Sequence, residues 1–342
     1  MSSDETRADA ITSLTTGDAA AGDALRAVVA AFERGLPGSV RGYYVVGSFA
    51  DATAITTSDL DVDIVLKDAA DAETLATARR LADGCVHDSA RELDITITDE
   101  AELARGCHPN FKLSSALIAG ADIRDQVPLI SLTDWTRDRM HSSWWRVARL
   151  FARPAIITLP LSYPEPAEPF LGYTQRTVRL SNGDTVASTR DLIRLIGWAA
   201  TALLALQCGV YVSDKRDVRR LYRERIGGES AALVEDVFTL CRTRWAYLIP
   251  NDPEERAALQ AICERTLGFE RSFVAVYREY LLAELHGDDM EGVRFAAEVL
   301  RRAPLRDDAV IAALEALTRR DSGAAGAEAR KALALLSESV GD

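Results

Sequence analysis

The chain has 342 residues, enough for one large or two ordinary domains that bury a substantial core. Its hydrophobic content of 48% and charged content of 27% are typical of a soluble globular protein. The net charge of −12 argues against a sequence-independent nucleic-acid binder, because such proteins need a basic surface to displace counterions. This charge is compatible with a cationic ligand, although an acidic surface also serves solubility alone.

Cysteine usage and the lack of a membrane-span pattern or a signal-peptide pattern indicate the cellular compartment. The five cysteines are scattered and show no Cys-x-x-Cys spacing, which favours reduced thiols over a disulfide framework or a zinc site. No apolar run reaches the roughly 18 residues of a membrane span. The polar residues 1–18 lack the basic-then-apolar pattern of a signal peptide and are expected to be disordered. We therefore expect a cytoplasmic protein with no membrane partner.

The first predicted elements are a helix and a strand. From Leu25, apolar residues recur at i, i+3, i+4 and i+7, so a helix is predicted from Gly22 until Gly35 and Pro37 end it. A short run of aromatic and β-branched residues then predicts a strand over 43–46. The helix should cover one face of the sheet behind this strand.

A tight turn, Gly47-Ser48, ends the strand. Because Gly47 has no Cβ, backbone N–H groups and the Ser48 hydroxyl can approach a phosphate closely. Ten residues, 49–58, then separate the turn from the first of a series of acids.

Asp59, Asp61 and Asp63 are spaced at i, i+2 and i+4. On a strand this period places all three carboxylates on one face and the intervening apolar side chains on the other. Like charges in a row repel each other unless cations lie between them. Beside a turn of phosphate size, the row predicts a divalent metal, and Mg²⁺ favours carboxylate and phosphate oxygens. Asp63 is open to a second interpretation, a salt-bridged surface acid.

A helix and a second acidic strand continue the sheet. The helix is predicted over 70–82, with Gly84 ending it, and the strand over 93–98, with Asp94 and Thr96 on one face. The segment 114–124 is a candidate closing strand. This order predicts a mixed sheet flanked by helices.

Past about residue 130 the pattern changes to helix. Beyond a proline-rich loop, a small hairpin is predicted over 176–186, turning at Asn182-Gly183. Predicted helices cover 134–152, a long apolar segment ending at 206, 214–226, 229–248, 253–266 and 268–286, followed by shorter amphipathic helices in 288–342.

The turn and the acids together resemble the signature of the nucleotidyltransferase superfamily, which includes β-type DNA polymerases and antibiotic (aminoglycoside) adenylyltransferases. The resemblance rests on Gly47-Ser48, on Ser58-Asp59-Leu60-Asp61, and on Asp94 within RELDITIT as the third acid of a later strand. It covers residues 20 to about 125 in motif order and extends only loosely to 188–250. One departure is Phe49-Ala50-Asp51-Ala52, where many members have a basic residue and a second glycine.

The resemblance implies an α+β fold: a nucleotidyltransferase domain with a mixed sheet flanked by helices, followed by an all-α helical bundle. The implied domains are a catalytic domain over 19–130, a helical substrate-binding domain with a small hairpin over 131–287, and a helical extension over 288–342.

The resemblance also implies roles for individual residues. Gly47 and Ser48, together with Ser58, would hold the triphosphate. Asp59 and Asp61 would bind two Mg²⁺ ions, and Asp94 would either complete the metal site or take the proton of the acceptor hydroxyl. Lys215, near the start of a late helix, matches a lysine that reaches phosphate in related adenylyltransferases; a surface lysine is the alternative.

The sequence therefore predicts an Mg²⁺-dependent nucleotidyltransferase that moves an NMP, AMP from ATP in the first instance, to a hydroxyl of a small cationic acceptor such as an aminoglycoside-like molecule, with release of pyrophosphate. One alternative acts on tRNA, on a protein, or on a second nucleotide to make a signalling dinucleotide. Another is a degenerate, non-catalytic nucleotide-binding protein. Oligomeric state is open.

Overall fold

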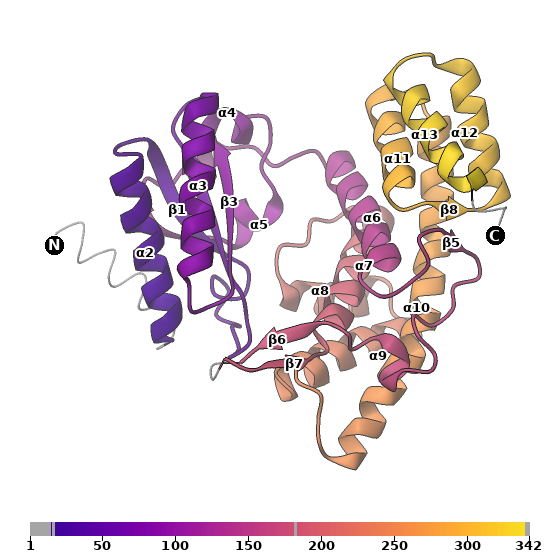
Figure 1. Ribbon diagram of the computed structural model, residues 1–342, viewed down its shortest axis with the longest axis horizontal. Helices are drawn as coiled ribbons and strands as arrows, with labels where there is room; N and C mark the ends of the chain where they lie inside the picture. The colour runs from indigo at the N-terminus through magenta and orange to yellow at the C-terminus, as the bar shows by residue number, and fades with distance from the viewer. Residues whose placement is uncertain (1–14, 16–17, 181–182, 339–342) are drawn as a thin grey trace. The chain divides into compact units, whose positions relative to one another are not determined.

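The computed structural model describes residues 15, 18–180 and 183–338 (Figure 1). Most of the predicted disordered segment 1–18 lies outside the described residues. The chain forms two compact units. One comprises Met1–Trp135 together with Tyr211–Asp217, and the other comprises Thr136–Val210 and Val218–Asp342.

The first unit contains a mixed four-stranded sheet with strand order β3-β2-β1-β4. β1 pairs antiparallel with β2 and with β4, whereas β2 and β3 run parallel. This arrangement confirms the predicted mixed sheet and the closing strand within 114–124. The elements of this unit are α2 (Ala19–Gly35), β1 (Val40–Val46), β2 (Leu60–Leu66), α3 (Ala72–Asp88), β3 (Leu93–Asp99), α4 (Glu100–Leu103), α5 (Pro109–Ser114), β4 (Ala116–Gly120) and a 3₁₀ turn, Arg124–Gln126.

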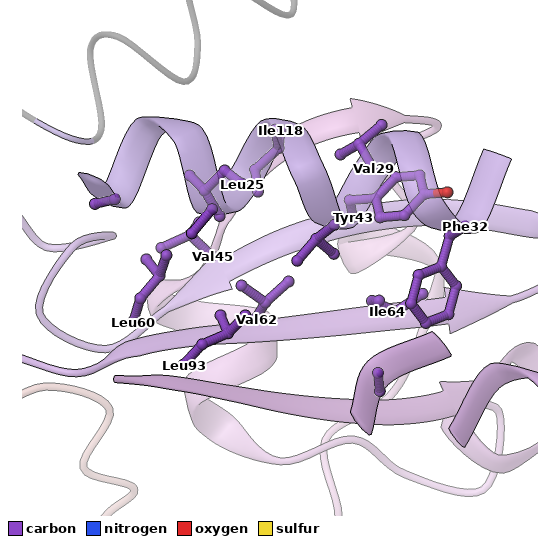
Figure 2. Packing of buried hydrophobic residues seen from close by; sticks show 14 of the residues in the cluster. Leu25, Val29, Phe32, Tyr43, Val45, Leu60, Val62, Ile64, Leu93 and Ile118 are labelled. Carbon is purple, nitrogen blue, oxygen red and sulfur yellow. The ribbon is translucent and has the colours of Figure 1, made fainter. Parts of the chain in front are cut away.

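The alternation of β2 divides the sheet into two faces. Leu60, Val62 and Ile64 are fully buried in one cluster, against apolar side chains of α2 and α3 (Figure 2). Burial of each such side chain contributes about 1.5–3 kcal/mol relative to exposure. On the opposite face, Val65 packs in a second cluster with Tyr44. The acids of β2 share this second face, as the period of two predicts.

α7 (Arg190–Cys208) is a 19-residue helix of the second unit that is mostly buried. By length and composition alone α7 could cross a membrane, but 67% of its apolar window is buried inside the protein, as in a core helix. The remaining elements are α6 (Leu132–Arg149) and α8 (Lys215–Arg225), which each cross a unit boundary, and β5 (Ile157–Thr158), a 3₁₀ turn (Pro169–Gly172), β6 (Thr177–Arg179), β7 (Thr185–Ala187), α7 (Arg190–Cys208), α9 (Gly228–Asp236), a π-helical segment (Val237–Arg244), α10 (Pro253–His286), α11 (Met290–Arg302), β8 (Leu305–Arg306), α12 (Asp308–Arg320) and α13 (Ala324–Glu338).

Several predicted boundaries differ from the structure. Gly84 lies inside α3 and Gly268 inside α10, so 253–266 and 268–286 form one helix of 34 residues. A Cβ at either glycine would meet no atom within 4 Å, which shows that neither position requires a glycine or a turn. Packing of the flanking helix faces outweighs the roughly 1 kcal/mol cost of an internal glycine. β6 and β7 pair antiparallel where the hairpin is predicted, although Asn182 of its turn lies outside the described residues.

Candidate functional site

The second acid of the motif lies close to the glycine turn. β1 ends at Val46, which pairs with Asp61 of β2. Gly47 follows with φ +67°, and a Cβ at this position would lie 2.9 Å from Oδ2 of Asp61. Any other residue would be strained by the left-handed backbone and would collide with the carboxylate. The turn therefore favours glycine because of its positive φ and the nearby carboxylate, whereas the predicted approach of a phosphate stays a prediction.

The third acid lies beside the second. In the parallel pairing of β2 and β3, Asp61 is opposite Asp94 and Asp63 is opposite Thr96. Asp61 is half-buried and Asp94 is exposed. The structure thus brings Gly47, Asp61 and Asp94 together on neighbouring strands. Asp59 precedes β2, which begins at Leu60, so the prediction that all three acids of the row project from one strand is wrong for Asp59.

The carboxylates do not form a closed metal cage. Within the described part of the chain, no group of three or more histidine, cysteine, aspartate or glutamate side chains is arranged to hold a metal ion. Mg²⁺, however, is commonly bound by one or two carboxylates together with substrate phosphates. The register neighbours Asp61 and Asp94, with Asp59 at the start of β2, offer this kind of incomplete donor set.

Asp63 lies one pleat further along the same face. Burial and repulsion by Asp94 raise the pKa of Asp63 from its ordinary value of 3.8 to about 7. Burial is the larger cause, because it removes water from the charged carboxylate, and the charge of Asp94 adds to the effect.

The raised pKa predicts a specific pH dependence of stability. The native state keeps the Asp63 proton up to about pH 7, whereas the unfolded chain releases it near pH 4. Asp63 therefore costs stability as the pH rises from about 4 to about 7, and this cost is constant above that range. At one pKa unit per about 1.4 kcal/mol, Asp63→Asn should become more stable than the wild type by at most about 4 kcal/mol at pH 8.

Urea unfolding of the wild type and Asp63→Asn between pH 4 and pH 8, without metal, measures this difference. Asp83→Asn is the control, since Asp83 is exposed on α3. If the difference between Asp63→Asn and the wild type does not change with pH, Asp63 titrates normally and the interpretation of its environment is wrong.

The two serines of the motif have different surroundings. Ser48 is 2% exposed, and its buried hydroxyl has no hydrogen-bond partner among the described residues. The Ser58 hydroxyl accepts a hydrogen bond of 2.9 Å from the N–H of Ile55, whose carbonyl accepts from the N–H of Ser58. Ser58 therefore closes a turn in the connector, residues 49–58. Its predicted nucleotide contact stays a prediction.

Arg91 holds this connector and is the residue that sequence reasoning missed. Its guanidinium donates to the carbonyls of Ser58 (3.0 Å) and Ile55 (3.1 Å), lies over the ring of Phe49, and forms a 2.7 Å ion pair with Asp18 at the start of α2. No local pattern distinguishes an arginine before a strand. Its contacts come from segments far apart in the sequence, so only the fold brings them together.

Arg91→Ala should lower the free energy of unfolding of the first unit by about 2–3 kcal/mol, because it leaves two carbonyls and a carboxylate without a charged donor. Arg80→Ala, an exposed arginine of α3, should change it by less than about 0.5 kcal/mol. Chemical denaturation monitored by circular dichroism compares the two. Equal midpoints would show that the connector does not depend on Arg91.

The segment Tyr211–Asp217 belongs to the first unit although it lies far along the chain. The hydroxyl of Tyr211 donates to the carbonyl of Ile130 (2.6 Å), and the hydroxyl of Ser114 donates to the carbonyl of Ser213 (2.8 Å). Arg216 donates to the carbonyl of Asp51 in the connector (3.2 Å). The half-buried Lys215 is therefore the sequence neighbour of Arg216, which contacts the connector. Both residues belong to the unit that carries the acids.

No protein-family model and no curated protein sequence matches the chain. Among solved structures, the chain is similar to the crystal structure of spectinomycin adenyltransferase AAD(9) from Enterococcus faecialis with ATP and spectinomycin. The two chains are 13% identical, the match covers 71% of this chain and 98% of that chain, and the TM-score is 0.40.

Proposed function

We propose that this protein is an Mg²⁺-dependent nucleotidyltransferase that transfers AMP from ATP to a hydroxyl of a small-molecule acceptor and releases pyrophosphate. The observation that carries the proposal is the close approach of the Asp61 carboxylate to the Gly47 turn, with Asp94 next in register. The turn is of a size to hold a phosphate, and the carboxylates of Asp61 and Asp94 lie beside it. These negative charges would therefore lie next to a bound triphosphate. A divalent cation is needed to offset the repulsion between them.

The residues of the turn bind and orient the triphosphate. Backbone N–H groups after Gly47 can donate to phosphate oxygens because no Cβ blocks their approach. A buried hydroxyl without a partner costs about 1–3 kcal/mol, so a phosphate oxygen within reach of Ser48 would relieve an existing cost. Lys215 would offset part of the triphosphate charge from the start of α8.

The acids divide the remaining work. Asp59 and Asp61, completed by Asp94, would hold the metal, which when bound stabilises the entering and leaving oxygens of the displacement. Asp94 is the exposed member of the register pair, so it can also accept a proton from an acceptor hydroxyl. The whole-chain charge of −12 is compatible with a cationic acceptor such as an aminoglycoside-like molecule.

A thermal-shift screen of the wild type and of Asp59→Asn/Asp61→Asn, with each NTP in the presence and absence of Mg²⁺, tests the proposal. A ligand at a hundredfold excess over its Kd stabilises the native state by about 2.7 kcal/mol. We expect such a shift for ATP with Mg²⁺ in the wild type and none in the double variant. A wild type that responds to no NTP would contradict the proposal and favour a degenerate, non-catalytic protein.

If ATP binds, the release of pyrophosphate from ATP is then measured in the presence of panels of candidate acceptors. The first panel contains aminocyclitols, and later panels contain tRNA, proteins and second nucleotides. Release that depends on an aminocyclitol supports a small cationic acceptor. Release that depends only on tRNA, protein or a nucleotide would overturn that part of the proposal while keeping the nucleotidyl transfer.

A further inference from the structure

The second unit contains a group of cations packed around one indole ring. Trp198 of α7 lies close to two arginines of α6, with the guanidinium carbon of Arg139 4.1 Å and that of Arg146 3.2 Å from the ring centroid. Two guanidinium groups at these distances would overlap if they shared one face of the ring. The indole therefore lies between them, and the two positive charges are fixed on opposite sides of a common support.

Among the described residues, the carboxylates of Asp138 and Asp191 lie near this group. Asp138 pairs with Arg139. The buried Asp191, at the start of α7, lies 3.7 Å from Arg176 and 4.0 Å from Arg194. Asp138 is therefore engaged by Arg139, whereas Asp191 makes only these long contacts and its buried Oδ1 accepts no hydrogen bond from the described residues.

Arg146 is the cation in excess. It donates to the Ser142 carbonyl (3.1 Å) and forms no ion pair with any residue that the structure describes. Its pKa is lowered to about 9 by burial and by repulsion from Arg139 and Arg194, and Asp138 and Asp191 offset this only in part. The excess is local, because the chain as a whole carries a charge of −12.

Such an arrangement is suited to an anion. A guanidinium presents a planar fork of donors that matches the oxygens of a carboxylate or a phosphate, and stacking on an aromatic ring holds the fork in a set orientation. Arg146, Arg176 and Arg194 each remain partly exposed, so a ligand can reach them from solvent.

We propose that Arg146, together with Arg139 and Arg194 around Trp198, forms a binding site for an oxyanion, a phosphate or carboxylate group, of a small molecule. The site lies within the second unit and does not depend on the nucleotidyl transfer proposed above. The site is positively charged, whereas the chain as a whole is acidic and is predicted to take a cationic acceptor. A molecule recognised here carries negative charge.

The test uses the full chain and three probes: inorganic phosphate, pyrophosphate and citrate. Thermal unfolding and isothermal titration calorimetry are measured against sodium chloride of equal ionic strength, which removes general screening. We expect stabilisation of the wild type by at least one probe. Arg146→Gln should weaken its binding at least tenfold. Arg194→Gln, where the side chain is 31% exposed, should weaken it several-fold and serves as the second variant if Arg146→Gln fails to fold.

Two further variants separate this site from other sources of anion binding. Arg319→Gln makes the same charge change at an exposed position of α12 and should bind the probe like the wild type. Asp59→Asn/Asp61→Asn should also keep the response, because the probe does not use the acids of the first unit. The proposal is overturned if no probe binds the wild type, if both cluster variants bind as tightly as the wild type, or if the response disappears in the aspartate double variant.

Discussion

Replacing Asp61 by asparagine is expected to lower Mg²⁺-dependent release of pyrophosphate from ATP by about 10³-fold or more. The change keeps the shape of the side chain but removes the charge that lies between the Gly47 turn and Asp94. Loss of a metal ligand removes several kcal/mol of transition-state stabilisation, and about 4 kcal/mol corresponds to a thousandfold change in rate. Turnover is measured with the best acceptor from the panels, or with water as a slow acceptor.

Asp83→Asn is the matched control for this experiment. It makes the same chemical change at an exposed position of α3, and turnover should stay within twofold of the wild type. Circular dichroism and the thermal midpoint without ligand show whether Asp61→Asn is folded. A folded Asp61→Asn protein with wild-type turnover would remove Asp61 from the catalytic site.

Gly47→Ala is expected to abolish Mg²⁺-dependent ATP binding, with Kd raised at least a hundredfold, while the fold is kept. The new methyl group would lie 2.9 Å from Oδ2 of Asp61, and the φ of +67° would cost an alanine about 1–2 kcal/mol. The turn or the carboxylate must then move, and either movement disturbs the phosphate site. Isothermal titration calorimetry with ATP and Mg²⁺ measures the effect.

Gly84→Ala tests the same substitution where no close approach exists. Gly84 lies inside α3 and has nothing within 4 Å of an added Cβ, so alanine should raise stability by about 0.5–1 kcal/mol and leave ATP affinity unchanged. The free energy of unfolding should thus fall in Gly47→Ala and rise in Gly84→Ala. If Gly47→Ala binds ATP as the wild type does, the turn does not contact the triphosphate.

The sequence by itself determined the parts of the candidate site that depend on local pattern. Alternation along β2 sets Asp61 and Asp63 on the face opposite Leu60 and Val62, because successive side chains of a strand point to opposite faces. The glycine that follows the first strand predicts a tight turn at this point. The order of strands, helix and acids was sufficient to predict a mixed sheet flanked by helices.

Only the tertiary structure decided which distant residues join these local elements. Arg91 contacts the connector and Asp18, and Tyr211–Asp217 belongs to the unit that carries the acids, although about 80 residues separate Tyr211 from its partner Ile130. The cluster around Trp198 joins α6 and α7 in the same way. A single arginine or tryptophan has no sequence period that reveals its partner. Burial, charge balance and stacking in the folded chain select these contacts.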